Sequence, residues 1–342
     1  MTQAFGVLAG LAAGLALATA AQAADAPAAA PSPAAAWWAG YLAKARLVAL
    51  PDGRRMNLYC EGRGAPVVVL DSGLGDGAWS WASVQDQMSA KTRVCAYDRA
   101  GYGRSSPGPA PRDSKAIVAD MAAMLKAARE PGPYVLVAHS LGSFDARLFA
   151  FTHLREVAGM VLVDPSADWQ MKRMAAAAPK MEALTNAAYA GLKPCAETPR
   201  PPERAKPCTL GRPAPSAEAQ AYLTAARGPG YYQAMLDEVS VFAQTDSEEL
   251  EAARQGLGPT PLGEKPLVIL TAGSLASPGL TPEEAAGAHR IWVTMHDEMA
   301  GLSTRGVNRV VDGSAHYIHQ EKPQAVLDAV AEVVDAVRQA RR

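Results

Sequence analysis

The chain has 342 residues, of which 49% are hydrophobic and 20% are charged, and its formal net charge at pH 7 is -1. A chain of this length and apolar content can bury a large core, and a net charge this close to zero gives no bias toward nucleic acid. We therefore expect a soluble globular protein, and we exclude a nucleic-acid-binding one.

The N-terminus is typical of a secretory signal peptide. An apolar run from Phe5 to Ala20 precedes Ala21-Gln22-Ala23, a small-x-small pattern like a signal cleavage site. We expect residues 1–23 to be removed and the protein to be periplasmic or secreted. A membrane anchor is the alternative, but the run is short for a membrane span, so we expect no stable insertion after cleavage. Residues 24–36 are rich in Ala and Pro, which predicts a disordered spacer.

A hairpin begins the part that is expected to fold. Residues 46–50 and 56–60 lie on either side of Asp52-Gly53, a dipeptide that supports the positive φ of a tight hairpin turn. Later runs are rich in β-branched residues and are typical of strands covered on both faces. These runs are residues 66–70, 93–97, 134–138, 160–164, 267–271 and 308–312.

Helical patterns alternate with these strands. They lie at residues 81–90, 114–128, the stretch after Ser140, 281–302 and 323–340. Alternation of this kind predicts α/β architecture, with a mostly parallel sheet and helices on both of its faces. We assign residues 37–166 and 264–342 to this core.

Residues 167–263 interrupt the alternation, because they contain no convincing strand and are rich in Ala, Pro, Met and Tyr. We interpret them as an inserted helical cap. Trp169, Tyr231 and Phe242 in the cap are candidates to line an apolar substrate cleft, since aromatic side chains adapt to varied ligands. The alternative is that they pack the core of the cap itself.

The four cysteines are expected to form disulfides, because an oxidising compartment permits them. Cys195 and Cys208 flank a Pro-rich, charged segment that cannot form a core, and a bridge between them would staple that loop. Cys60 and Cys95 lie on two predicted strands and would pair if those strands are neighbours. No CxxC or HxxxH cluster occurs, so we expect no metal site.

The junction VLVAHSLGSFDARLFA, residues 135–150, places Ser140 where a buried strand passes directly into a helix. A sharp strand-to-helix turn holds a nucleophilic hydroxyl clear of the surface and requires small residues two positions before and after it. Ala138 and Gly142 meet that requirement. Leu141 then lies at the helix N-terminus, where a free N–H and the helix dipole favour developing negative charge.

A nucleophilic serine needs a histidine to accept its proton. His316 lies just after the last predicted strand, at the sheet edge that Ser140 also occupies, where ligands of open α/β sheets bind. We expect it to be the base, with His319 as the alternative. His139 is not expected to be the base, because its side chain and that of the adjacent Ser140 would point to opposite faces of the strand.

The histidine in turn needs an acid that fixes its tautomer. No Asp or Glu follows the strand at residues 267–271, where the sequence continues AGSLASPGL. Asp164 ends the strand at 160–164 and is our leading candidate, with Asp168 as its rival. The alternative is that Asp164 only caps the turn before Pro165.

Two glycine-containing loops complete the prediction. In DSGLGDGAW, residues 71–79, glycines allow a close approach of backbone amides, so the amide of Leu74 could join that of Leu141 in binding an oxyanion. In YDRAGYGRSS, residues 97–106, we expect Asp98 and Arg99 to form an architectural ion pair rather than a catalytic one.

Five segments, in this order, resemble the alpha/beta-hydrolase superfamily: VVVLDSGLGDGAWSW, RVCAYDRAGYGRSS, YVLVAHSLGSFDARLFA, GMVLVDPSAD and DGSAHYIHQEKP. The resemblance implies an eight-stranded sheet whose second strand neighbours the fourth, which would place Cys60 beside Cys95. It implies Ser140 as nucleophile, His316 as base, and Asp164 as the acid of those members in which the acid follows the sixth strand.

The resemblance also implies oxyanion donors at Leu74 and Leu141. This chain departs from the common pattern, because Ala138 replaces a glycine and Ser72-Gly73 replaces a frequent His-Gly.

Together these features predict a serine hydrolase that acts through an acyl-enzyme on a small-molecule carboxylic ester of moderately apolar character, with no cofactor. Epoxide and haloalkane hydrolysis are not expected, since those relatives use an aspartate where Ser140 stands. Peptidase, perhydrolase or carbon–carbon hydrolase chemistry would use the same residues. A binding protein that kept the fold without the reaction is an alternative of another class.

Overall fold

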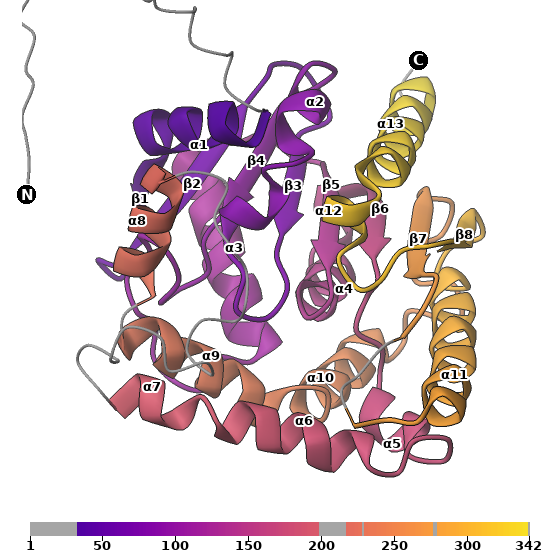
Figure 1. The fold of residues 1–342 in the computed structure, drawn as a ribbon. Helices are drawn as coiled ribbons and strands as arrows, with labels where there is room; N and C mark the ends of the chain where they lie inside the picture. Colours follow the sequence, from indigo (N-terminus) through magenta and orange to yellow (C-terminus); the bar gives the residue numbers. More distant parts are fainter. Residues whose placement is uncertain (1–32, 198–216, 228, 276–278, 341–342) are drawn as a thin grey trace, which may run out of the picture. The chain divides into compact units, whose positions relative to one another are not determined.

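The computed structural model describes residues 33–197, 217–227, 229–275 and 279–340. At its centre is a sheet of eight strands in the order β1-β2-β4-β3-β5-β6-β7-β8 (Figure 1). The strands are β1 (Arg46–Ala49), β2 (Arg55–Glu61), β3 (Val68–Asp71), β4 (Val94–Tyr97), β5 (Tyr134–His139), β6 (Val157–Val163), β7 (Leu267–Ala272) and β8 (Gly306–Val311). Strands β4, β3 and β5 to β8 are parallel, so the mostly parallel α/β architecture expected from the sequence is confirmed.

The predicted hairpin is also confirmed. Strands β1 and β2 pair antiparallel, with Ala49 opposite Arg55, and β2 then pairs antiparallel with β4. Gly53 in the connecting turn has a φ of +86°, a conformation that glycine adopts without steric cost.

Apolar residues cover both faces of the central strands. In β3, Val68 and Leu70 belong to one hydrophobic cluster and Val69 to the other. Because successive side chains of a strand point to opposite faces, a continuous apolar run buries both sides of the sheet. This double burial explains why the central strands are predictable from their β-branched composition.

Helices pack against the sheet on each side. They are α1 (Pro33–Lys44), α2 (Gln85–Ser89), α3 (Ser114–Ala128), α4 (Gly142–Thr152), α11 (Pro282–Ala300), α12 (Ile318–Glu321) and α13 (Pro323–Ala340), with the short 3-10 helices η1 (Ala78–Trp81) and η2 (Leu154–Glu156). Helices α3, α4 and α11 contribute to one cluster, whereas α1 and α13 contribute to the other. The two clusters are the cores of the two layers that enclose the sheet.

Helix α1 corrects the N-terminal boundary. It begins at Pro33, so residues 33–36, which the composition assigns to a disordered spacer, are helical. Trp37 and Tyr41 of this helix are buried, and their rings stack at 4.9 Å. Burial of these aromatic rings stabilises the helix despite the alanine and proline that precede it. The predicted signal peptide, residues 1–23, lies outside the described residues.

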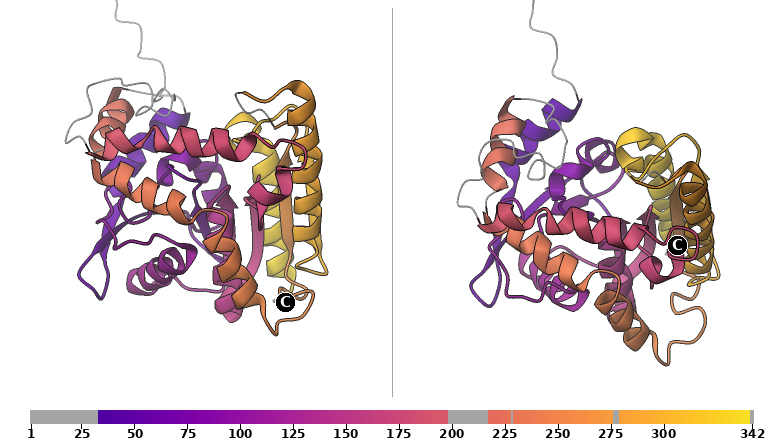
Figure 2. Two further views of the ribbon diagram at one scale, coloured as in Figure 1. Left: turned by 90° about the horizontal axis from the view of Figure 1, so that it is seen from below. Right: turned by 60° about the horizontal axis from the view of Figure 1, so that its bottom comes forward.

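Between β6 and β7, the part of the chain that the structure describes contains six helices. They are α5 (Gln170–Met174), α6 (Met181–Ala190), α7 (Lys193–Glu197), α8 (Ala217–Ala226), α9 (Pro229–Val241) and α10 (Thr245–Arg254). In Figures 1 and 2 several of them form a layer across one end of the sheet. Glu238 of α9 contacts Arg99 after β4, so this layer meets the carboxyl ends of the strands.

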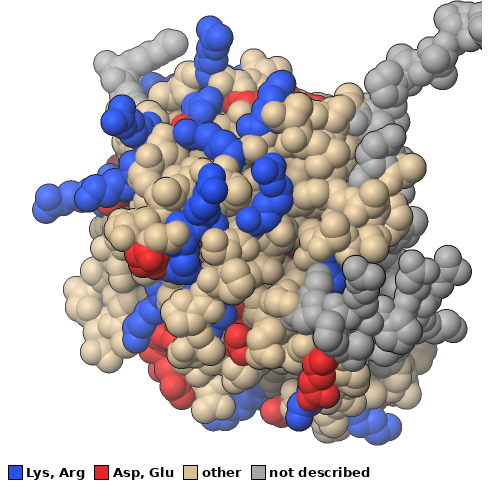
Figure 3. All heavy atoms as spheres, turned by 90° about the vertical axis from the view of Figure 1, so that its left-hand side faces the viewer, with Lys and Arg blue, Asp and Glu red and all other residues tan. Residues whose placement is uncertain are grey.

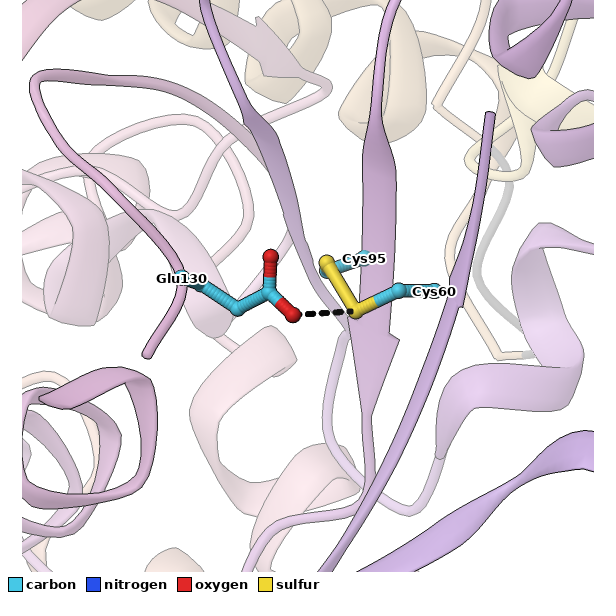
Figure 4. A group of neighbouring side chains, drawn as sticks. All are labelled: Cys60, Cys95 and Glu130. Carbon is cyan, nitrogen blue, oxygen red and sulfur yellow. Dashed lines mark hydrogen bonds between the residues drawn. A yellow bond between two sulfur atoms is a disulfide. The ribbon is translucent and has the colours of Figure 1, made fainter. Parts of the chain in front are cut away.

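Cys60 and Cys95 form a disulfide between β2 and β4, where they are directly opposite (Figure 4). Glu130 Oε1 lies 3.7 Å from the Cys60 sulfur, and the same carboxylate accepts hydrogen bonds from Arg93. Both sulfur atoms are already bonded, so this group is not a thiolate metal site. Cys195 is also disulfide-bonded, whereas Cys208 lies outside the described residues.

Basic side chains gather on the face that contains strand β1 (Figure 3). Arg46 in β1 is half exposed and pairs with Glu130, and Arg55 at the start of β2 is exposed. Charged side chains on an edge strand disfavour pairing with another sheet.

Among the described residues, we find no helix with the length and apolar character that crossing a membrane requires.

Candidate active site

Ser140 stands in a sharp turn between β5 and α4, and its side chain is partly exposed. Its φ of 51° lies in the left-handed region that non-glycine residues seldom adopt. A side chain at Gly142 would place Cβ 2.7 Å from the carbonyl oxygen of Ser72, so only glycine fits there. Ala138 is buried in β5 opposite Asp71, where its methyl group is accommodated. The turn therefore has the small flanking residues that its backbone requires.

His316, in the loop between β8 and α12, lies between Ser140 and Asp164. Its Nε2 is 2.9 Å from Ser140 Oγ, and its Nδ1 is 2.6 Å from Asp164 Oδ2. The carboxylate only accepts hydrogen bonds, so Nδ1 carries the proton and Nε2 is left to accept the serine hydroxyl. The side chain of Asp164 is 5% exposed and that of His316 is 43% exposed, so the carboxylate is buried whereas the histidine faces solvent in part.

Asp164 is held from both sides. Its Oδ1 accepts hydrogen bonds from Trp292 Nε1 at 2.8 Å and from the backbone N–H of Ala272 at 2.9 Å. Burial raises the pKa of this carboxyl, but the neighbouring groups together, led by the hydrogen bond and charge of His316, leave the pKa below its ordinary value. Asp164 is therefore an ionised, oriented carboxylate.

His296 of α11 packs beside Asp164 in the neutral state. Its Nε2 donates to the carbonyl oxygen of Pro165 at 2.8 Å, and its Nδ1 lies 2.7 Å from Thr271 Oγ1. Burial lowers the pKa of His296 to about 4. The ring therefore supports Asp164 without adding a second charge at neutral pH.

The alternative residues take other partners. Asp168 pairs with Arg147 at 2.5 Å. His319 is buried and its ring packs against Trp81 at 4.7 Å. His139 is buried, and its Nε2 donates to the backbone carbonyl oxygen of His316 at 2.9 Å, which fixes the loop that carries His316.

The loop after β3 passes directly beside Ser140. A side chain at Gly73 would place Cβ 3.2 Å from the Cβ of Ser140 and 2.7 Å from His139 Nδ1. Leu74 follows this glycine, and Leu141 precedes helix α4 on the other side of the serine. The two predicted oxyanion donors thus belong to the two backbone segments that adjoin the nucleophile.

The three aromatic residues predicted to bind substrate lie in different surroundings. Tyr231 is buried, and its hydroxyl donates to the carbonyl oxygen of Gly75. Trp169 donates from Nε1 to Glu251 at 2.6 Å, and Phe242 packs against Phe144 with ring centroids 6.2 Å apart. Each therefore has a contact of its own within the protein.

Arg99 and Glu238 form a buried ion pair that the sequence did not indicate. Asp98 and Arg99 are neighbours in the chain, but Asp98 accepts from Tyr41 and Asn57 instead. Arg99 donates to both carboxylate oxygens of Glu238, at 2.8 and 3.0 Å. Burial disfavours the charged guanidinium, but the neighbouring carboxylates, led by Glu238, outweigh it and hold the pKa of Arg99 well above its ordinary value.

Comparison with known proteins adds an independent line of evidence. A model of the alpha/beta hydrolase family matches residues 67–329. The uncharacterized protein YqjL of Bacillus subtilis (strain 168) is 24% identical over 274 residues, which are 80% of this chain and 85% of YqjL. The family match spans strands β3 to β8, helices α5 to α10 between β6 and β7, and the loop of His316.

Two solved structures share the fold. A provisionally named epoxide hydrolase from Pseudomonas aeruginosa matches with a TM-score of 0.62 and 18% identity, over 87% of this chain and 98% of the other. A thermophilic esterase from Thermogutta terrifontis matches with a TM-score of 0.57 and 18% identity, over 86% of this chain and 99% of the other. At these identities the similarity concerns the fold.

Proposed function

The chain belongs to the alpha/beta hydrolase family, and from that premise we propose that it is a serine hydrolase that cleaves carboxylic esters through an acyl-enzyme. The observation that carries the proposal is the relay of 2.9 Å from Ser140 Oγ to His316 Nε2 and 2.6 Å from His316 Nδ1 to Asp164 Oδ2. These lengths are within hydrogen-bond reach for a nucleophile, a base and an orienting acid.

In the proposed reaction, Ser140 Oγ attacks the ester carbonyl carbon while its proton passes to His316 Nε2. The tetrahedral oxyanion accepts hydrogen bonds from the backbone N–H groups of Leu74 and Leu141. His316 then returns the proton to the departing alkoxide, which leaves the acyl group on Ser140. Water, deprotonated by His316, releases the acid and restores the serine.

Moderately apolar small-molecule esters are the proposed substrates, and the reaction requires no cofactor. An aspartate nucleophile of the epoxide-hydrolase type is not available at this position, because the residue is Ser140. The same relay would support peptidase, perhydrolase or carbon–carbon hydrolase chemistry, and the choice among these rests on substrate tests.

Labelling with a fluorophosphonate tests the nucleophile. We expect stoichiometric labelling of the wild-type protein, loss of labelling in Ser140→Ala, and at least a ~10³-fold lower kcat for p-nitrophenyl butyrate in that variant. Ser240→Ala, an exposed serine on α9, is the control and should label like the wild type. If the folded wild-type protein is not labelled, the result would support the alternative that this chain is a binding protein without the hydrolase reaction.

Ester preference is tested by a substrate series. We expect p-nitrophenyl esters of short to medium chain length to be cleaved with higher kcat/KM than the matching anilides. Preference for the anilides, or turnover only of peroxide or carbon–carbon substrates, would contradict the esterase assignment while leaving the nucleophile in place.

We also propose export to the periplasm or the medium. The signal-like residues 1–23 and the disulfide between Cys60 and Cys95 support it, since disulfides persist in oxidising compartments. Mass spectrometry of the exported protein should find Ala24 at its N-terminus. Recovery of the protein only in the cytosol, with residues 1–23 retained, would contradict the proposal.

A further inference from the structure

The loop at residues 72–75 is held by side chains through its carbonyl oxygens. Arg99 donates from Nη1 to the carbonyl of Ser72 and from Nη2 to that of Gly73, the latter at 2.9 Å. Tyr231 donates to the carbonyl of Gly75. Two of these three carbonyls are therefore bound by a single guanidinium group, and the carbonyl of Gly73 also accepts a hydrogen bond from the backbone N–H of Asp76 at 3.1 Å.

The bond to Gly73 has a direct consequence for the neighbouring amide. The carbonyl of Gly73 and the N–H of Leu74 belong to one peptide unit, which is trans and planar, so the two groups point in opposite directions. When Arg99 holds the carbonyl oxygen on one side, the N–H of Leu74 is directed to the other side. The loop passes Ser140 at this position, as the spacing around Gly73 shows.

Glu238 of helix α9 sets the orientation of the Arg99 guanidinium. Glu238 binds Arg99 through both carboxylate oxygens, a geometry that fixes the plane of the guanidinium. Tyr102 donates to Glu238 Oε2 at 2.8 Å, and the side chains of Arg99 and Glu238 are 2% and 1% exposed. The other carboxylate on Arg99, that of Asp71, is more distant at 3.2 Å, and burial raises its pKa to about 6.

We propose that Arg99 and Glu238 are positioning residues for the oxyanion site. Glu238 orients the guanidinium of Arg99, and Arg99 holds the Gly73 carbonyl so that the N–H of Leu74 faces the oxyanion formed at Ser140. This assignment rests on the proposed function, and it gives helix α9 of the insertion a role in the chemical step. Tyr231 is a second anchor from the same helix, rather than a substrate contact.

The competing explanation is that the ion pair of Arg99 and Glu238 only stabilises the fold, because a buried ion pair that loses one partner destabilises a protein whatever its position. The two explanations differ in what else changes. If the pair only stabilises the fold, its loss lowers the free energy of unfolding and leaves kcat of the folded protein unchanged. A positioning pair lowers kcat and weakens binding of a tetrahedral anion, while KM for the ground-state ester stays nearly constant.

The test compares Glu238→Gln with Glu249→Gln. Glu249 is also a buried glutamate of the insertion, but it binds the backbone N–H of Lys115 in α3, away from the oxyanion loop. For each folded variant, kcat and KM are measured with p-nitrophenyl butyrate, and the inhibition constant is measured with an alkyl trifluoromethyl ketone, which forms an anionic hemiketal on serine.

We expect Glu238→Gln to lower kcat by ~10- to 100-fold and to raise the inhibition constant by a similar factor, because a donor in this type of site contributes ~10²- to 10³-fold. KM should change by less than about twofold, and Glu249→Gln should retain the wild-type values of all three constants. Unchanged kcat and inhibition constant in folded Glu238→Gln would overturn the proposal.

Tyr102→Phe keeps the test decisive if Glu238→Gln does not fold. It removes only the hydroxyl that holds Glu238, so we expect a smaller paired change of ~3- to 10-fold in kcat and in the inhibition constant. Tyr134→Phe, which removes a buried hydroxyl bonded to the Glu130 carbonyl far from the site, is its control. No change in Tyr102→Phe would then overturn the proposal.

The two proposals fail in different ways. A wild-type protein that neither reacts with fluorophosphonate at Ser140 nor hydrolyses esters overturns the serine-hydrolase assignment and the positioning role together. A wild-type protein that does both, with Glu238→Gln equal to it in kcat and inhibitor affinity, overturns only the positioning role.

Discussion

The indole N–H of Trp292 donates to Asp164 Oδ1 at 2.8 Å, whereas the other carboxylate oxygen, Oδ2, binds His316. Trp292 is buried in α11, so this bond is shielded from water. The carboxylate therefore cannot rotate without breaking a hydrogen bond, and its orientation toward His316 is set by a residue far along the chain.

We expect Trp292→Phe to lower kcat about tenfold, because loss of one donor loosens the carboxylate and raises the pKa of Asp164. KM should stay near the wild-type value. Trp37→Phe is the matched control, since Trp37 is also buried and donates from Nε1 to Gln85, away from the relay. Steady-state ester kinetics check this, and equal kcat values for the two variants would contradict the role given to Trp292.

Asp164 and Asp168 are separated by comparing their asparagine variants. We expect Asp164→Asn to lower kcat by ~10³- to 10⁴-fold, because an amide can stabilise the wrong histidine tautomer and cannot stabilise the imidazolium. Asp168→Asn should keep kcat within about threefold of the wild type but lower the free energy of unfolding by about 1–3 kcal/mol, since Arg147 is buried and would lose its charged partner.

Urea unfolding and ester turnover, measured on the same preparations, check both variants. A large loss of kcat in Asp168→Asn with little loss in Asp164→Asn would reverse the assignment of the acid.

Ser140, His316 and Asp164 were predictable from the sequence because each lies at the end of a predicted strand or shortly after one. The carboxyl ends of parallel strands meet at one edge of the sheet, so three residues distant in the chain were expected to meet. Trp292 and Glu238 lie on helices whose rotation and placement depend on tertiary packing. No local pattern distinguishes their polar atoms from those of other helical residues, so their contacts were not predictable.

Helix α1 escaped prediction for a related reason. Its helical stability depends on burial of Trp37 and Tyr41 against distant parts of the chain, including Tyr59 of β2. The alanines and prolines that precede these rings have the composition of a linker, and composition alone does not include the packing that makes residues 33–36 helical.

We expect Asp246 to contribute to the pH dependence of the free energy of unfolding. This carboxyl in α10 accepts hydrogen bonds from the backbone N–H and the hydroxyl of Ser114, and burial raises its pKa from 3.8 to about 6. Because the folded state binds the proton more tightly than the unfolded state, the stability that this group contributes is complete below 3.8 and is lost as pH rises through about 6.

Asp246→Asn removes this dependence while keeping an oxygen that can accept from Ser114. We expect the free energy of unfolding of the variant, relative to the wild type, to increase by at most ~3 kcal/mol between about pH 4 and pH 7.5. Urea unfolding at several pH values measures the difference. A difference that stays constant over this range would show that Asp246 has no raised pKa in the folded protein.

Gly73 is expected to tolerate no side chain. A Cβ at this position would meet His139 Nδ1 at 2.7 Å and Ser140 Cβ at 3.2 Å. Neither atom is the free end of a flexible side chain, because Cβ is fixed by the backbone and the His139 ring is buried and bonded to the carbonyl of His316. We expect Gly73→Ala to displace the loop and lower kcat by ~10²-fold or more, since a shift of about 1 Å at a reacting group has this effect. Gly230→Ala, where a Cβ meets nothing within 4 Å, is the control. Circular dichroism establishes that both variants fold, and ester kinetics compare them; wild-type kcat in folded Gly73→Ala would mean that the loop can move away from Ser140 without consequence for the reaction.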